Sequence, residues 1–102
     1  MQTNAIESIW ARRDRLKIFA EILEVAKGSQ LKTRIMYKVN LSYTQVNEYL
    51  SFLTKKGFLR VYKKSRKKYY ETTSKGKLYI ENYMEMTNCL MPQELEVPML
   101  IR

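Results

Sequence analysis

Histidine is absent from the 102 residues, and the chain has one cysteine, two prolines and three glycines. Without histidine the chain lacks the commonest general base, metal ligand and pH switch, so it cannot build a Ser-His-Asp triad or a zinc site of the usual kinds. Cys89 lies among methionines and leucines, where an inert packed thiol is favoured over a nucleophile. An enzyme is therefore the least supported class, and we expect no catalytic residue, metal or cofactor.

Other features that mark small-molecule or membrane sites are also missing. The three glycines are too dispersed for a phosphate-binding loop, and pairs of glutamates on one helix face, at Glu21 and Glu24 and at Glu81 and Glu85, have no further ligand nearby in sequence. No apolar run approaches the 18 residues of a membrane span, and the N-terminus shows no secretory signal. We expect a cytoplasmic, nucleoid-associated protein with no membrane partner, and no small-molecule ligand is evident.

The composition that remains is that of one small folded domain. Apolar residues make up 45% of the chain and aromatic residues 12%, which argues against disorder despite the net charge of +9. A chain of this length has room for one modest core. Association with a second chain is therefore an early expectation.

The positive charge is concentrated in the middle of the chain. Residues 1–30 carry five basic and four acidic groups, residues 31–77 carry 13 and two, and residues 78–102 carry one and four. Such a basic segment between near-neutral and acidic ends is typical of a phosphate-binding surface on a neutral scaffold. An anionic membrane is the competing partner, but the densest basic run, residues 63–68, lies between strand-like residues and not on an amphipathic helix.

Apolar residues at three- and four-residue spacing predict three helices in the first half of the chain. The first spans residues 14–27 and either begins near residue 4 or follows a separate short helix, on which Trp10 is expected to pack and not to stack on bases. The second spans 31–39, with Ser29 as its cap, and ends at Asn40. The third spans 43–56, and its buried stripe is Val46, Tyr49, Leu50 and Leu53.

A helix-turn-helix and a hairpin follow from the local signals. Ser42 and Gln45 form a capping box only a tight turn after the second helix, so the second and third helices cross sharply. Alternating residues over 58–72 predict a β-hairpin whose two strands are joined by the basic loop KKSRKK. A basic hairpin directly after a helix-turn-helix is a wing. The predicted fold class is α+β, a winged helix-turn-helix with an additional C-terminal helix.

The fourth helix begins after its cap at Ser74 and ends before Pro92. Its apolar residues cover more than one stripe, which favours a dimer helix over packing within one chain. We therefore expect a homodimer whose interface includes Leu78, Tyr79, Tyr83, Met86 and Leu90. The expected organisation is a helical extension at 1–13, a winged helix-turn-helix domain at 14–73, a dimerisation helix at 74–91 and a tail of unresolved role at 92–102.

The sequence from KTRIMYKVNLSYTQVNEYL through KYYETTSKGKLYIENY resembles the archaeal winged-helix DNA-binding proteins typified by the ten-kilodalton "a" group of Sulfolobus. The resemblance covers about residues 14–86. Its most specific parts are K-T-R-I-x-Y at 32–37, N-L-S at 40–42 and T-x-K-G at 73–76. It implies a winged helix, dimerisation through an antiparallel coiled coil of the last helix, and duplex DNA binding with little sequence preference. The chain departs from that pattern where Pro92 breaks the fourth helix.

The predicted DNA-binding surface has three parts. The third helix would enter the major groove with its outward face, which carries Tyr43, Thr44, Gln45, Asn47, Glu48, Ser51 and Lys55. Phosphates would be neutralised from the second helix by Lys32, Arg34 and Lys38, and from the wing by Lys63, Lys64, Arg66, Lys67 and Lys68. Gln45 and Asn47 suit adenine edges, although the capping box already uses Gln45. The third helix has no arginine, so backbone contacts are favoured over base readout.

The predicted function is thus binding of double-stranded DNA through phosphates with low sequence specificity, in a chromatin or architectural role. A sequence-specific transcriptional regulator of an archaeon or an archaeal virus is the nearest alternative. A protein-interaction winged helix has no need of such a basic middle segment. RNA binding through Tyr62, Tyr69 and Tyr70 is a third alternative, but tyrosines on strands more often pack than stack on bases.

Overall fold

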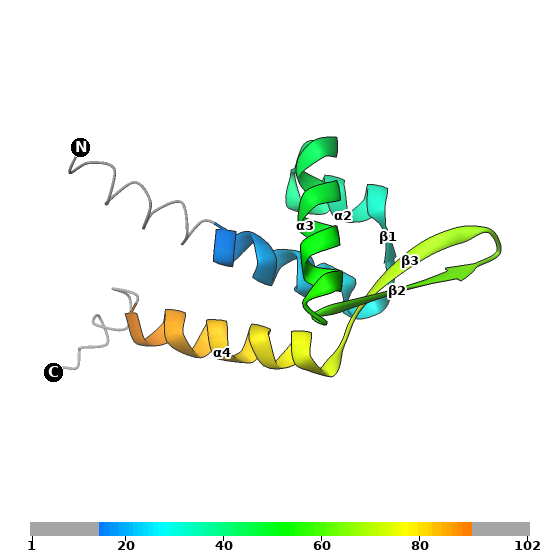
Figure 1. Cartoon of the computed structure of the whole chain (residues 1–102). Coiled ribbons are helices and arrows are strands. Elements are labelled where there is room, and N and C mark those ends of the chain that lie inside the picture. Colours follow the sequence, from blue (N-terminus) through cyan, green and yellow to red (C-terminus); the bar gives the residue numbers. More distant parts are fainter. Residues whose placement is uncertain (1–14, 91–102) are drawn as a thin grey trace, which may run out of the picture.

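The computed structural model of the chain describes residues 15–90 (Figure 1). The expected helical extension at 1–13 with Trp10, and the tail at 92–102, lie outside the described residues. After a helix over residues 15–25, the elements in chain order are η1 (Ala26–Gly28), β1 (Gln30–Leu31), α2 (Lys32–Val39), α3 (Tyr43–Lys55), β2 (Leu59–Lys64), β3 (Lys67–Thr72) and α4 (Ser74–Leu90).

The turn between α2 and α3 has the predicted form. Asn40 ends α2 in the left-handed conformation with φ 60°, which asparagine tolerates better than most residues. The Ser42 hydroxyl accepts a hydrogen bond from the backbone N–H of Gln45 at 3.1 Å. In return, the backbone N–H of Ser42 donates to the side-chain oxygen of Gln45 at 3.0 Å. This capping box is confirmed. It satisfies two backbone donors at the start of α3 and fixes where the helix begins.

The segment before α2 differs from its prediction. Ser29 does not cap the helix, since the N-cap residue is Leu31 and no side chain bonds there. Gln30 and Leu31 form instead the short strand β1, which pairs antiparallel with Tyr70 and Tyr69 of β3. The prediction missed this strand because its pairing partner is about 40 residues away, and a local capping signal carries no information about it.

The sheet is antiparallel with strand order β1-β3-β2. The pairs between β2 and β3 run from Leu59 with Thr72 to Lys64 with Lys67, so only Ser65 and Arg66 form the turn. The six-residue basic loop expected from the sequence is therefore wrong. Four of its residues belong to the strands, which places their side chains at defined positions. The hairpin from Leu59 to Thr72 is called the wing below.

The cap of α4 lies one residue earlier than the Ser74 predicted from the sequence. The Gly76 amide donates to the Thr73 hydroxyl at 3.1 Å, so Thr73 caps the helix and Ser74 is its first residue. A Cβ at Gly76 would lie 2.4 Å from the Phe58 carbonyl oxygen, so no larger residue fits here. The Lys75 ammonium donates to the Lys56 carbonyl at 2.8 Å, at the end of α3. These contacts give the T-x-K-G sequence a structural role.

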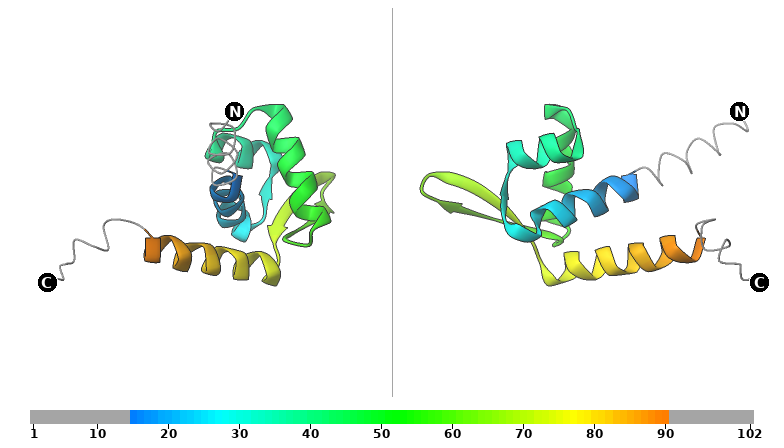
Figure 2. Two further views of the ribbon diagram at one scale, coloured as in Figure 1. Left: turned by 60° about the vertical axis from the view of Figure 1, so that its left-hand side comes forward. Right: turned by 180° about the vertical axis from the view of Figure 1, so that it is seen from behind.

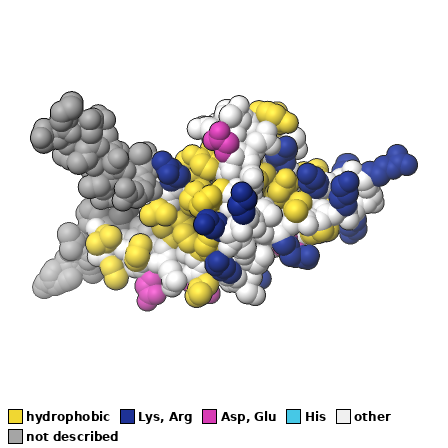
Figure 3. Space-filling view, viewed as in Figure 1, with side chains coloured by type: hydrophobic (Ala, Val, Ile, Leu, Met, Phe, Trp, Pro, Cys, Tyr) yellow, Lys and Arg dark blue, Asp and Glu magenta, His cyan; other side chains and the backbone are white. Residues whose placement is uncertain are grey.

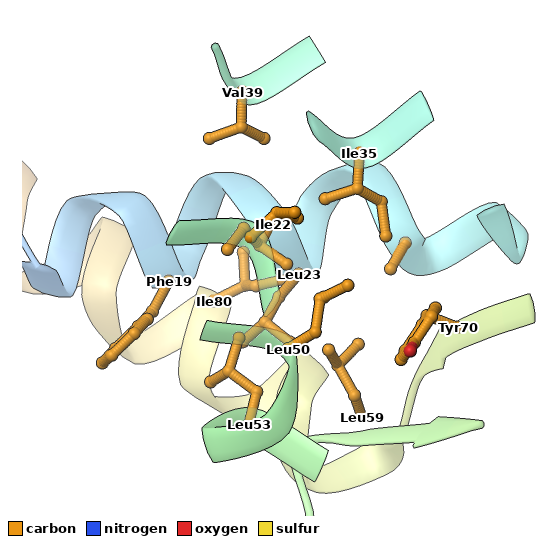
Figure 4. Close-up of a cluster of buried hydrophobic side chains, with 12 residues drawn as sticks. Phe19, Ile22, Leu23, Ile35, Val39, Leu50, Leu53, Leu59, Tyr70 and Ile80 are labelled. Carbon is orange, nitrogen blue, oxygen red and sulfur yellow. The ribbon is translucent and has the colours of Figure 1, made fainter. Parts of the chain in front are cut away.

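One core joins all the helices to the sheet (Figure 4). The predicted stripe of α3 is largely confirmed, because Val46, Leu50 and Leu53 are buried while Tyr49 is partly buried. The Thr72 hydroxyl donates to the Leu23 carbonyl at 2.5 Å within this core. The core side chains are Phe19, Ile22, Leu23, Ala26, Ile35, Val39, Val46, Leu50, Leu53, Leu59, Tyr70 and Ile80.

The wing and α4 extend from opposite sides of this core. In both views of Figure 2 the hairpin projects to one side of the helices, and α4 runs away from it. Only Gly76 and Ile80 of α4 are buried, both in its first two turns. Over residues 15–90 the structure is the expected winged helix, with four α-helices and a small three-stranded sheet. Most of α4 lacks a packing partner within the described residues.

Candidate nucleic-acid interface

Lysine and arginine side chains cover the end of the wing, whereas on the helical body a few of them lie among apolar side chains (Figure 3). In this view lysine and arginine side chains gather along the wing, and apolar side chains gather over the helical body and α4. The wing thus presents its charge away from the core and from α4. This arrangement gives a polyanion access to the wing without contact with the apolar side.

The cations of the wing face one another across its two strands. Lys63 is paired with Lys68, and Lys64 with Lys67, and all four side chains are exposed. Like charges directly opposite each other destabilise a strand pair. Successive residues point to opposite faces of a strand, so one lysine pair lies on each face. Both faces of the wing tip are therefore positive.

The turn of the wing adds a fifth cation at a strained position. Ser65 and Arg66 have φ values of 53° and 69°, as in a two-residue type I′ turn. Such turns favour Asn-Gly, because a side chain with a Cβ is strained at positive φ. Arg66 nevertheless occupies the second position and is exposed. The wing tip thus combines five cations with a turn sequence poorly suited to its backbone.

The base of the wing is neutral and packed. Arg60 forms an ion pair with Glu71 at 2.5 Å and lies over the Tyr62 ring at 5.0 Å. Tyr62 stacks on Tyr69 with ring centroids 5.7 Å apart, and Tyr70 is buried in the core. These tyrosines pack against the protein, which gives no support to the alternative of RNA bases stacking on them.

The outward face of α3 carries most of the predicted residues. Thr44, Glu48, Ser51 and Lys55 are exposed on successive turns. A hollow of about 430 Å³ runs along this face and is lined by Asn47, Glu48, Ser51, Phe52 and Lys55. Gln45 is also exposed, but its side-chain oxygen is held in the capping box.

Three predicted residues form a network at the start of α3. The Lys32 ammonium donates to the Asn47 side-chain oxygen at 2.7 Å and lies 5.0 Å from the centre of the Tyr43 ring. The hydrogen bond with Asn47 and the charge of Lys32 lower the pKa of Tyr43 below its ordinary value. The network joins α2 to α3. It also means that Lys32 and Asn47 do not act as separate contacts.

The remaining predicted cations lie on α2. Arg34 and Lys38 are exposed there, whereas Ile35 and Val39 of the same helix are buried. Sequence reasoning missed two exposed aromatic residues, Tyr37 on α2 and Phe52 on α3. Tyr37 falls outside the buried stripe of its helix, and that signal was available in the sequence. Phe52 was harder to find, because it also stacks on Phe19 with centroids 5.3 Å apart.

The residues predicted to form a dimer divide into two groups. Tyr79 is used within the chain, since its hydroxyl donates to the Leu16 carbonyl at 2.7 Å and its ring packs against Phe58. Burial raises the pKa of Tyr79 to about 12. The partly buried Tyr83 stacks on Tyr79. The exposed group is Leu78, Met86 and Leu90, together with Met84, which the prediction did not include.

Two further observations concern residues 15–90 only. No three histidine, cysteine, aspartate or glutamate side chains within this range come together as metal ligands. No helix in the same range is long and apolar enough to cross a membrane.

The fold and the basic hairpin define a winged-helix protein. A sequence profile described as winged helix-turn-helix matches residues 12–91. The uncharacterized protein MJ0287 of Methanocaldococcus jannaschii is 38% identical over 73 residues, which are 71% of this chain and 72% of the relative. The chain belongs to the winged helix-turn-helix family.

Further relatives differ in length and in closeness. The uncharacterized protein MJ0290 of the same organism is 32% identical over 84 residues, and the match spans only 38% of its length. Among solved structures, the chain is similar to Sso10a-2, a DNA-binding protein from Sulfolobus solfataricus, with 30% identity, a TM-score of 0.65, and coverage of 85% of this chain and 95% of the other. The likeness to the archaeal group named from the sequence is thereby confirmed. The MarR family regulator NMB1585 of Neisseria meningitidis, 20% identical with a TM-score of 0.61 and coverage of 93% and 70%, shares the fold.

Proposed function

We propose that the protein binds double-stranded DNA as a homodimer, mainly through phosphates, and serves an architectural role in the nucleoid. The observation that carries this proposal is the wing tip, where two cross-strand lysine pairs flank Arg66. Repulsion among these five cations works against folding of the hairpin, and a polyanion relieves it. The similar Sulfolobus structure is that of a DNA-binding protein, which supports the same class of ligand.

Docking follows the geometry of the helix-turn-helix. The outward face of α3 enters the major groove, α2 crosses the backbone with Arg34 and Lys38, and the wing follows the neighbouring phosphates. Each phosphate that a lysine or arginine neutralises releases condensed counterions, which makes the affinity depend steeply on salt. The wing and α2 thus supply most of the affinity.

Low sequence specificity follows from what α3 presents. The helix carries no arginine, the residue most often used to read guanine. The side-chain oxygens of Gln45 and Asn47 already accept hydrogen bonds within the protein, so neither side chain is ready for a bidentate contact with adenine. Contacts that position the protein on the backbone therefore outweigh contacts that distinguish bases.

The wing assignment predicts a specific change in salt dependence. Replacing Lys64, Arg66 and Lys67 together by alanine removes three phosphate contacts. The slope of log affinity against log salt concentration should become shallower by about 2.7, at roughly 0.9 for each contact on B-form DNA. The measurement is a fluorescence titration of a duplex at four or more salt concentrations, and affinity should fall on all sequences alike.

A matched variant separates this effect from a general loss of charge. Arg15→Ala with Lys17→Ala removes two exposed cations from the first helix, away from the wing. This variant should leave the slope close to that of the unmodified protein. If the wing variant keeps its original slope, or if both variants change the slope equally for each charge removed, the wing does not bind the backbone.

A further inference from the structure

The Lys32–Asn47 hydrogen bond fixes which atoms of Asn47 are available. An ammonium group only donates hydrogen bonds, so the atom of the Asn47 amide that faces Lys32 at 2.7 Å is its oxygen. The amide hydrogens then point away from Lys32. The orientation of the amide therefore follows from chemistry, even though oxygen and nitrogen have nearly the same size.

Bound in this way, Lys32 and Asn47 together offer hydrogen-bond donors only. A bidentate contact with adenine needs an acceptor for the N6 amino group and a donor for N7, and the acceptor is the Asn47 oxygen that Lys32 occupies. Guanine presents two acceptors, N7 and O6, on its major-groove edge. One hydrogen of the Asn47 amide is directed to the Tyr43 oxygen, and the remaining hydrogens of the ammonium and the amide match the guanine pattern.

We propose that Lys32 is a specificity-determining residue that turns α3 from a reader of adenine into a reader of guanine by holding the oxygen of Asn47. This inference rests on the proposed binding of duplex DNA in the major groove. It assigns Lys32 a role different from that of Arg34 and Lys38, which bind phosphates. It also provides the donor that α3, without arginine, does not supply itself.

Tyr43 supports the network independently of DNA. Its pKa is lowered by the hydrogen bond with Asn47 and by the charge of Lys32. Lys32→Met keeps the apolar stem of the side chain and removes the ammonium. In that variant the pKa of Tyr43 should rise toward 10.0, which NMR of the protein with labelled tyrosine rings measures. An unchanged titration of Tyr43 would show that the network does not form in solution.

The test of base choice is selection from a library of randomised duplexes, with sequencing of the bound fraction. For the unmodified protein, guanine should be preferred over adenine at one position by about tenfold, a value within the range for one good base contact. Lys32→Met should reverse this preference to adenine, because the Asn47 oxygen is released. Asn47→Ala should abolish both preferences.

Lys38→Met is the matched control, since it removes one exposed cation from the same helix. It should weaken binding while leaving the guanine preference unchanged. Equal preferences in the Lys32→Met and Lys38→Met variants, or no preference in the unmodified protein, would overturn the inference while leaving DNA binding intact. No binding of any duplex by the unmodified protein would instead refute the proposed function and this inference with it.

Discussion

At position 66, stability of the hairpin favours glycine, whereas the proposed binding of DNA favours the arginine that is present. Its φ of 69° lies in the left-handed region, where a residue with a Cβ costs roughly 1–2 kcal/mol. Glycine would fit this turn better and would also remove one charge from a crowded tip. The needs of the hairpin do not explain an arginine at this position, and we attribute it to the proposed contact with DNA phosphates.

Replacing Arg66 by glycine should therefore raise stability and lower affinity for DNA. We expect a gain of about 0.5–1 kcal/mol in the free energy of unfolding, measured with urea, because strain and repulsion are both relieved. Affinity for duplex DNA should fall in the same variant. Ser65→Asn is the control, because asparagine is also favoured in this turn but its introduction keeps Arg66 and its charge. This variant should leave the affinity for DNA unchanged. A gain in both stability and affinity for Arg66→Gly would contradict the account.

The boundaries and contacts of the helices and strands show what could and could not be predicted from the sequence. The capping box and the stop at Asn40 were predictable, because the groups involved lie within a few residues of each other. β1 and the hydrogen bond between Thr72 and Leu23 were not predictable, because they join segments distant in sequence. The cations of the wing could be placed on the hairpin from the sequence, but their pairing across the two strands became visible only with the register.

The contact of α4 with the first helix depends on the protonation of Tyr79. Its pKa is about 12 in the folded chain and 10.0 in the unfolded chain, so the folded state holds the neutral form. The stabilisation by its hydroxyl, which donates to the Leu16 carbonyl, is complete below pH 10 and is lost as the pH rises toward 12.

Tyr79→Phe should consequently lower stability at pH 8 by about 1 kcal/mol, the usual net contribution of one hydrogen bond. The difference from the unmodified protein should shrink at pH 11, because phenylalanine has no proton to lose. Urea unfolding at the two pH values measures this. Tyr37→Phe, at an exposed tyrosine, serves as the control and should have little effect at pH 8. A difference for Tyr79→Phe that grows with pH would contradict the assignment.

At the scale of the whole molecule, the proposed dimer uses the part of α4 that the core leaves uncovered. Met84, Met86 and Leu90 are all more than half exposed. Met86 and Leu90 lie one turn apart on α4, with Tyr83 on the same face, and an apolar stripe of this kind is typical of a helix that packs against another helix. A dimer built on α4 would carry two wings on the far sides of the two cores, able to contact two stretches of duplex.

Introducing charge on this face should therefore give monomers. Tyr83→Glu with Met86→Glu places two carboxylates in the proposed interface, and analytical ultracentrifugation should show a sedimenting species of one chain. Glu81→Gln, at an exposed position of the same helix, should leave the dimer intact. A double variant that folds and remains dimeric would exclude α4 as the interface.

The central claim is that affinity comes from phosphates and hardly from base sequence. It is tested most directly by fluorescence titration of a random-sequence duplex over a range of salt concentrations, with a pool of genomic fragments as competitor. We predict comparable affinities for random and genomic DNA, both falling steeply with salt. Fragments that outcompete the random duplex by about a thousandfold or more would contradict the claim, since that ratio is typical of specific readout and would identify a transcriptional regulator.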